Sequence, residues 1–188
     1  MAGDQLTYSR TPEAHASCVR ATAWLLGIDV AQRHASTVRR YGEDMAGARQ
    51  FQVTFDCAKP ERVARFWCEA LGYVVPPPPP GFADWDEFNR ALPAEKQDSA
   101  FACVDPDGAG PRLFFQRVPE GKTVKNRVHL DIRVAPGLQG ADRLAVLEAE
   151  CTRMVDLGAT RVRLLPAGDG EESCIVMQDV EGNEFCLD

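Results

Sequence analysis

The chain has 188 residues, 45% of them hydrophobic, and a formal net charge of −7 at pH 7. This is enough for one well-buried core or two small modules. The acidic balance, without a run of lysine and arginine, argues against a nucleic-acid surface. Seven cysteines without a C-x-x-C pair indicate reduced thiols in a cytoplasmic protein, not a disulfide framework. The sequence predicts neither a signal peptide nor a membrane partner.

Residues 1–50 differ in composition from the rest, because Arg, Ala, Ser, Thr and His dominate them. We interpret them as an N-terminal extension, partly helical or loosely ordered, with a short helix from Pro12 to Leu26 that Gly27 ends. His15 and His34 lack neighbouring metal-ligand residues, so they receive no metal role. The folded domain is predicted over residues 51–188.

The first module, residues 51–119, opens on a strand with Val53 and Phe55 on one face and polar residues between them. A helix follows from Pro60 to the stop at Gly72. Residues 73–75 are extended, and the prolines of 76–80 form a stiff connector. The aromatic residues Phe82, Trp85 and Phe88 then predict a short helix over one end of a cleft, or a surface excursion packed by its own rings. Two strands, 100–104 and 112–118, complete the module around the turn 105–108.

The second module, residues 126–188, opens on the alternating segment 126–134, which predicts a half-buried strand. Its polar face carries His129, Asp131 and Arg133. A helix after Gly140 ends at Gly158, and its apolar positions are Leu144, Leu147, Cys151, Met154, Val155 and Leu157. Strands at 161–165, 173–178 and 183–187 finish the chain.

The two modules repeat one order of elements: strand, helix ending in Leu-Gly, strand, strand, acidic turn with glycine, strand. Leu71-Gly72 corresponds to Leu157-Gly158, and the turn 105–108 to the turn 179–182. The fold class is therefore α+β, with two tandem βαβββ modules whose mixed sheets close around a central cleft. The strand alternation then brings Gln52, Gln116, His129 and Cys186 together in that cleft.

These features resemble the vicinal oxygen chelate superfamily of glyoxalase and bleomycin-resistance proteins, in its glyoxalase-like domain group. The resemblance rests on residues 53–58, 65–72, 127–131 and 177–186 and covers about residues 51–188. It implies a small-molecule ligand or substrate, and it makes a homodimer reasonable.

Metalloenzymes of the superfamily hold a divalent metal with four cleft residues, commonly His or Gln, Glu, His and Glu. By resemblance these positions are Gln52, Gln116, His129 and Cys186, so both carboxylates are missing. A hard divalent ion needs anionic oxygen ligands, and glutamine cannot shuttle the proton of glyoxalase-like isomerisation. The favoured interpretation is therefore no metal cofactor. The alternative is a metal such as zinc, with Cys186 as thiolate beside His129 and an acid such as Asp131 or Glu184.

Besides a dimeric scaffold domain whose cleft is filled by its own side chains, two functions follow, and whether the protein is an enzyme stays open. The first is a metal-independent small-molecule-binding protein with its ligand in the cleft between the modules. The alternative is a metal-dependent lyase, isomerase or dioxygenase-like enzyme that uses His129. The predicted ligand-binding residues combine aromatic rings with a few polar groups: Gln52, Thr54, Trp85, Phe101, Phe114, Gln116, His129, Asp131 and Cys186.

Overall fold

The computed structural model describes residues 49–168 and 170–188. Residues 77–91 belong to one compact unit, whereas residues 50–76 and 92–188 form another, and each is described by itself. The predicted helix from Pro12 to Leu26, together with His15 and His34, lies outside the described residues.

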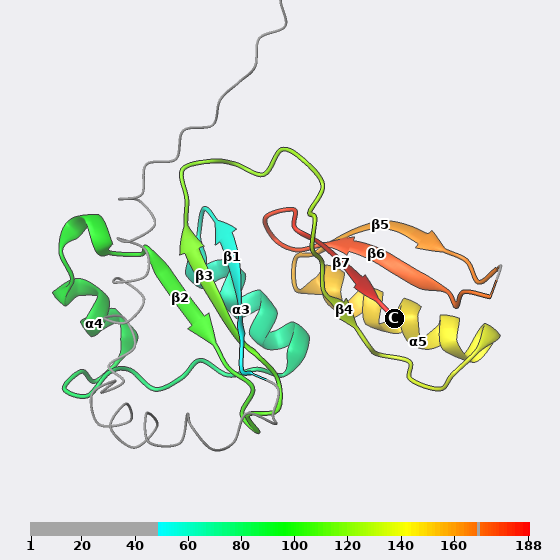
Figure 1. Cartoon of the computed structure of the whole chain (residues 1–188), viewed down its shortest axis with the longest axis horizontal. Helices are drawn as coiled ribbons and strands as arrows, with labels where there is room; N and C mark the ends of the chain where they lie inside the picture. Colours follow the sequence, from blue (N-terminus) through cyan, green and yellow to red (C-terminus); the bar gives the residue numbers. More distant parts are fainter. Residues whose placement is uncertain (1–48, 169) are drawn as a thin grey trace, which may run out of the picture. The chain divides into compact units, whose positions relative to one another are not determined.

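The first module contains a three-stranded sheet in the order β1-β3-β2 (Figure 1). Strand β1 (Gln52–Cys57) runs parallel to β3 (Arg112–Arg117), and β2 (Ala100–Cys103) runs antiparallel to it. Helix α3 (Pro60–Leu71) packs on one face of this sheet through Val63, Phe66 and Trp67. The helix ends at Gly72, whose φ of 70° is a left-handed conformation that glycine adopts without steric cost.

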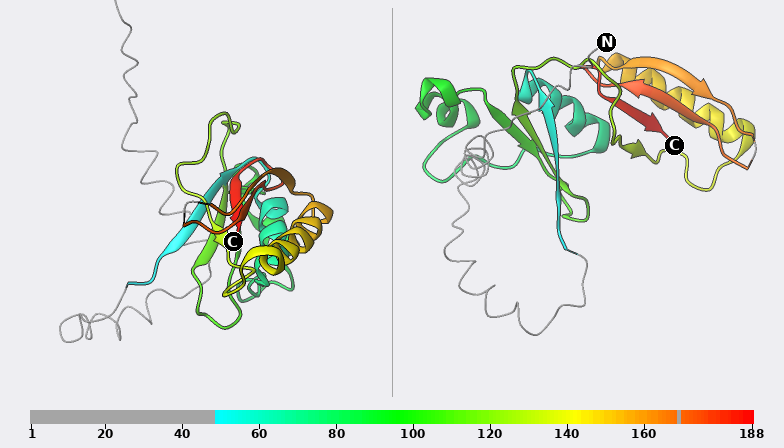
Figure 2. Two further views of the ribbon diagram at one scale, coloured as in Figure 1. Left: turned by 90° about the vertical axis from the view of Figure 1, so that its right-hand side faces the viewer. Right: turned by 45° about the horizontal axis from the view of Figure 1, so that its top comes forward.

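The second module contains a four-stranded sheet in the order β4-β7-β6-β5. Its elements are β4 (Asp131–Ile132), α5 (Gly140–Asp156), β5 (Thr160–Leu165), β6 (Cys174–Gln178) and β7 (Glu184–Leu187). Helix α5 follows one face of the sheet (Figure 2). On that face the strands bury Ile175, Met177, Phe185 and Leu187.

The strand order agrees in part with the repeat predicted from sequence. In each sheet the strand before the helix lies parallel to the last strand of the module. The second module has the full βαβββ order, whereas in the first module one antiparallel bridge, Val74 to Val104, stands where β5 stands in the second. The α+β class is confirmed, and closure of the sheets around a cleft stays a prediction.

The two modules share one hydrophobic core, which is built around Trp67. The ring of Trp67 lies 5.3 Å from that of Phe55 on β1 and 5.3 Å from that of Phe185 on β7. Phe115 of β3 stacks on Phe55 at 5.0 Å. Arg153 of α5 donates to the carbonyl of Glu69 at 3.1 Å, which satisfies a backbone acceptor near the end of α3.

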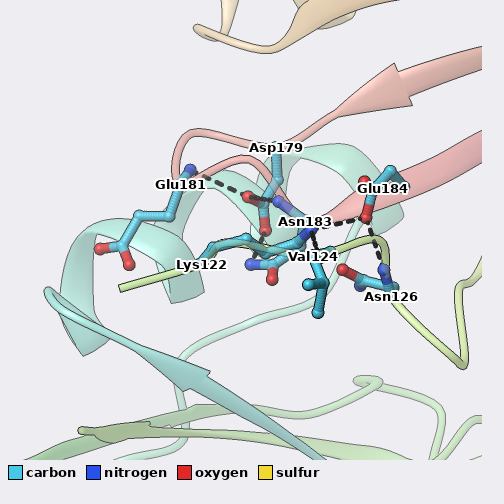
Figure 3. Close-up of polar contacts among 7 residues, drawn as sticks. All are labelled: Lys122, Val124, Asn126, Asp179, Glu181, Asn183 and Glu184. Atoms are coloured by element: carbon cyan, nitrogen blue, oxygen red, sulfur yellow. Dashed lines mark hydrogen bonds and ion pairs between the residues drawn. The ribbon is translucent and has the colours of Figure 1, made fainter. Parts of the chain in front are cut away.

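The turn between β6 and β7 links the modules through Asp179, which is only 3% exposed. Its carboxylate accepts hydrogen bonds from the backbone N–H groups of Glu181 (2.9 Å) and Asn183 (3.0 Å) (Figure 3). It also accepts one from Nε1 of Trp67 (3.2 Å). The Asn183 amide donates to the same carboxylate at 2.9 Å. Asp179 therefore both shapes its own turn and orients the central ring of the core.

Glu181 makes a second link from the same turn. Its carboxylate accepts the backbone N–H groups of Ala58 at 2.6 Å and Lys59 at 2.8 Å, just before α3 begins. An acid here also complements the positive end of the helix dipole. Residues 177–186, which carry part of the family resemblance, thus include a structural connection between the modules.

The prediction of a strand over residues 126–134 is wrong in extent, because β4 contains only Asp131 and Ile132. The register explains the difference. Asp131 pairs with Cys186, so residues before 129 would pair with the turn that precedes Glu184, the first residue of β7. Val128 is accordingly 77% exposed. The alternation holds from 130 onward, where Leu130, Ile132 and Val134 pack against the core.

The apolar stripe predicted for α5 is also partly wrong. Leu147, Cys151 and Met154 are buried, but Val155 is 46% exposed, and Arg143 takes the buried position one turn before Leu147. Arg143 donates to the carbonyls of Ser173 at 3.0 Å and Ala135 at 3.1 Å, and it pairs with the Asp188 carboxylate. These acceptors explain how a guanidinium is accommodated there.

The unit that contains residues 77–91 includes α4 (Trp85–Ala91), which confirms the predicted short helix. Its aromatic rings pack edge to face, with Phe88 at 5.1 Å from Phe82 and 5.7 Å from Trp85. A 3-10 turn, η1 (Ala94–Lys96), follows in the larger unit. The cysteines of the described residues are free, and none of the described helices has the length and apolar character needed to cross a membrane.

Candidate functional site

The sheet of the first module carries a polar face on the side away from α3, as the alternation predicts. We call this the first polar face, and it consists of Gln52, Thr54, Asp56, Arg112, Phe114 and Gln116. The parallel register sets Gln52 beside Arg112, Thr54 beside Phe114 and Asp56 beside Gln116. Gln52, Thr54 and Asp56 are exposed, whereas Arg112 and Gln116 are half-buried.

Hydrogen bonds tie the two predicted glutamines to their neighbours on this face. Arg112 Nη1 donates to Gln52 Oε1, and Gln52 Nε2 donates to Thr54 Oγ1 at 3.1 Å. At the other end, Gln116 Nε2 donates to Asp56 Oδ1 at 2.6 Å. The carbonyl oxygen of Gln52 therefore faces a guanidinium cation.

Arg112 is the main residue of this face that the sequence interpretation missed. Its guanidinium carbon lies 5.0 Å from the centroid of the Phe114 ring, a cation–π distance. Burial lowers the pKa of Arg112, because removal from water disfavours the charged form, although a guanidinium stays protonated at neutral pH. The signal was available, since Arg112 shares strand parity with Phe114 and Gln116.

The sheet of the second module brings together His129, Asp131 and Cys186, which we call the His-Asp-Cys cluster. One potential ligand atom from each residue lies within 4.8 Å of the others. His129 Nε2 is 3.3 Å from Asp131 Oδ1, and both side chains are largely exposed. Burial, followed by the charge of Asp131, raises the pKa of the Cys186 thiol to about 12, so without a metal it stays protonated at neutral pH.

The structure separates other residues of the predicted set. Phe101 pairs with Phe115 on the helix side of the sheet, and the guanidinium of Arg65 on α3 lies 6.0 Å from its ring. Since paired residues of neighbouring strands point to one side, Phe101 does not share a face with Phe114. Trp85 belongs to the unit of residues 77–91, and its place in a cleft stays a prediction.

The acid Glu184, near the His-Asp-Cys cluster in sequence, has a different set of partners (Figure 3). Its carboxylate pairs with Lys122 Nζ at 2.9 Å and accepts the backbone N–H of Asn126 at 3.0 Å. Lys122 also donates to the carbonyl of Val124 at 2.6 Å. Through these contacts Glu184 holds the segment that connects the modules, at Lys122 and Asn126, next to β7.

This arrangement makes stability depend on pH. Burial alone would raise the pKa of Glu184, but Lys122 and the backbone donors outweigh it and lower the pKa to about 2. A carboxyl with a depressed pKa in the folded state stabilises the fold above its unfolded pKa, and that contribution disappears as pH falls from about 4.5 towards 2. We expect Glu184→Gln to lower the free energy of unfolding by about 2 kcal/mol at pH 7. Urea denaturation at several pH values should show this difference shrinking below about pH 4.5, and a constant difference would contradict the assignment.

Comparison with protein families identifies the domain. The profile of the glyoxalase-like domain family matches residues 52–187. The chain belongs to this family. Its glyoxalase-like domain therefore accounts for both modules and confirms the resemblance to the glyoxalase and bleomycin-resistance superfamily.

Solved structures similar to this glyoxalase-like protein are distant in sequence. The fosfomycin resistance protein FosX from Listeria monocytogenes is 12% identical, with 77% of this chain and 90% of that chain covered and a TM-score of 0.48. A glyoxalase/bleomycin resistance protein/dioxygenase family enzyme from Burkholderia phytofirmans PsJN is 12% identical, with coverages of 72% and 94% and a TM-score of 0.46. TioX from Micromonospora sp. ML1 is 15% identical, with coverages of 74% and 97% and a TM-score of 0.42. Among curated proteins there is no significant match.

Proposed function

We propose that this glyoxalase-like protein binds a small molecule without a metal, with the ligand held between the two modules. The observation that carries the proposal is the hydrogen bond from Arg112 to Gln52 Oε1. By resemblance Gln52 would be the first metal ligand, and this oxygen is its metal-binding atom. A divalent cation bound to this oxygen would lie beside the Arg112 guanidinium. Two cations that close repel each other strongly where bulk water does not screen them.

Gln116, the second position of the metal set, supports the same proposal. Its amide donates to Asp56, so the acid nearest to it is already in a hydrogen bond. Because Gln52 and Gln116 are neutral, the first polar face offers no anionic ligand at either position to offset dehydration of a hard ion. The set Gln52, Gln116, His129 and Cys186 therefore does not fit a hard divalent metal. We also propose that the binding protein is a cytoplasmic homodimer.

Metal content and ligand binding together test this proposal. The protein, purified without a metal-chelating tag, is expected to contain no stoichiometric zinc, iron, manganese or nickel. In a thermal-shift screen of a small-molecule library, compounds that bind should then raise the melting temperature of the metal-free protein. A ligand at 100 times its Kd stabilises the fold by about 2.7 kcal/mol. Stoichiometric metal that is lost in His129→Ala, or stabilisation that requires added metal, would refute the proposal.

The His-Asp-Cys cluster favours a second candidate, a metal-dependent lyase, isomerase or dioxygenase-like enzyme. Its imidazole, carboxylate and thiol are the ligand types that zinc takes in proteins. A bound zinc ion would supply Lewis-acid polarisation of a substrate oxygen. Because metal binding must displace the thiol proton, affinity should rise with pH and fall in Cys186→Ser. Zinc titration of the native protein, Cys186→Ser and His129→Ala measures these affinities directly. Equal zinc affinities in the three proteins would exclude the His-Asp-Cys cluster as the zinc site.

A further inference from the structure

We infer that the ligand of the first polar face carries an oxyanion, a carboxylate or a phosphate-type group, that Arg112 and the hydroxyl of Thr54 bind. This inference rests on the proposed function, because it names the class of ligand for the same site. It follows from the charge, burial and hydrogen bonds of Arg112.

Arg112 brings a positive charge to the first polar face. Within the described residues, the side-chain partners of Arg112 are the Gln52 amide oxygen and the Phe114 ring, and both are neutral. The guanidinium is half-buried, so water compensates its charge only in part. An anion bound beside it would supply the missing counter-charge.

The guanidinium of Arg112 offers further N–H donors to a ligand. A guanidinium has five N–H donors in a rigid planar fork, and one of them is directed to Gln52. Phe114 packs against the guanidinium and is itself only 5% exposed, so the fork is held in place before a ligand binds. A fork of this kind matches two oxygens of a carboxylate or phosphate group.

Thr54 offers a second donor on the same face. The Gln52 amide directs its oxygen to the Arg112 donor, so its NH₂ group points to Thr54 Oγ1. Since that oxygen accepts from Gln52, the hydroxyl proton of Thr54 is left to donate. Thr54 pairs with Phe114, two residues from Arg112 on β3, so Thr54 and Arg112 are diagonal neighbours whose Cα atoms lie roughly 7–8 Å apart. Both side chains contact the Gln52 amide, so one oxyanion can reach both donors.

Asp56, the acid of this face, lies at the end away from Arg112. Along β1 it is four residues from Gln52, about 13 Å at the rise of a strand, and two residues from Thr54, about 7 Å. It accepts a hydrogen bond from Gln116 at that far end. An anion held mainly by Arg112 therefore lies at the positive end of the face, with Thr54 between it and the carboxylate.

Calorimetric titration of the metal-free full chain with benzoate, phenylphosphonate and neutral benzamide tests the inference. At least one of the two anions should bind, and benzamide should bind at least tenfold more weakly. Arg112→Leu should weaken anion binding tenfold or more, and Thr54→Val roughly threefold. The matched control is Arg117→Leu, which removes the same charge from an exposed position on the helix side of β3 and should leave binding unchanged. Benzoate against phenylphosphonate distinguishes a carboxylate from a phosphate-type ligand.

Arg112→Lys guards against a variant that fails to fold, because it keeps the charge and loses only the planar fork; its affinity should fall between those of the native protein and Arg112→Leu. Equal anion binding in Arg112→Leu and Arg117→Leu would overturn the inference, and so would no anion binding at millimolar concentration. If benzamide binds the metal-free protein as well as benzoate does, the inference fails while the proposed function stands. Anion binding that needs added zinc and is unchanged in Arg112→Leu would overturn both the inference and the proposed function.

Discussion

Replacement of Asp179 by alanine is expected to lower the free energy of unfolding by about 3–5 kcal/mol. The carboxylate is buried and accepts four hydrogen bonds, from two backbone N–H groups, the Asn183 amide and the Trp67 indole. Alanine would leave these buried donors without an acceptor and would remove the group that orients the central aromatic ring. Urea denaturation followed by tryptophan fluorescence measures the change.

Asp107→Ala is the matched control for this substitution. Asp107 lies in the corresponding turn of the first module, but it is exposed, so its removal should change the free energy of unfolding by less than about 0.5 kcal/mol. A similar loss in both variants would mean that turn formation, and not the buried hydrogen bonds of Asp179, determines the stability.

The sequence predicts the order of elements well because local alternation and helix stops depend on nearby residues. Gly72 ends α3 as expected, and apart from β4 the strands of both sheets lie close to their predicted ranges. The predicted parity of β3 and β7 is also confirmed, since Phe115, Phe185 and Leu187 are buried on the helix side. These features require no knowledge of which strands are neighbours.

Strand 126–134 was predicted too long because its extent depends on a partner more than 50 residues away. Glu184 begins β7, and the register with Asp131 leaves no strand beside residues 126–128. The alternation of apolar and polar residues is the same in the paired and unpaired parts. A single sequence does not contain the register between distant strands.

The candidate site shows the same division between local and distant information. Strand parity places Gln52 and Gln116 on one face and brings His129, Asp131 and Cys186 to the same side of the other sheet. It did not identify Arg112 as the partner of Gln52, because that contact depends on the parallel pairing of β1 with β3. The misplacement of Phe101 has a similar cause, since its face follows from its pairing with Phe115.

The buried Arg143 leads to the second large prediction. Its guanidinium binds two backbone carbonyls and the Asp188 carboxylate, and the residue is only 4% exposed. We expect Arg143→Met to lower the free energy of unfolding by about 3–5 kcal/mol, because methionine fills part of the space but leaves a carboxylate and two carbonyls without their donor. Chemical denaturation of the purified variant measures the loss.

Arg133 provides a control that shares the same acid. It pairs with Asp188 at 3.3 Å, but its side chain is 73% exposed, so Arg133→Met should cost less than about 1 kcal/mol. Asp188→Asn introduced into Arg143→Met should recover part of the lost stability, since it removes a charge whose remaining partner, Arg133, is exposed. If the double variant is as unstable as the sum of the single variants, the loss comes from packing and from the two carbonyls. Recovery would instead show that loss of the buried Arg143 partner makes the Asp188 carboxylate part of the cost.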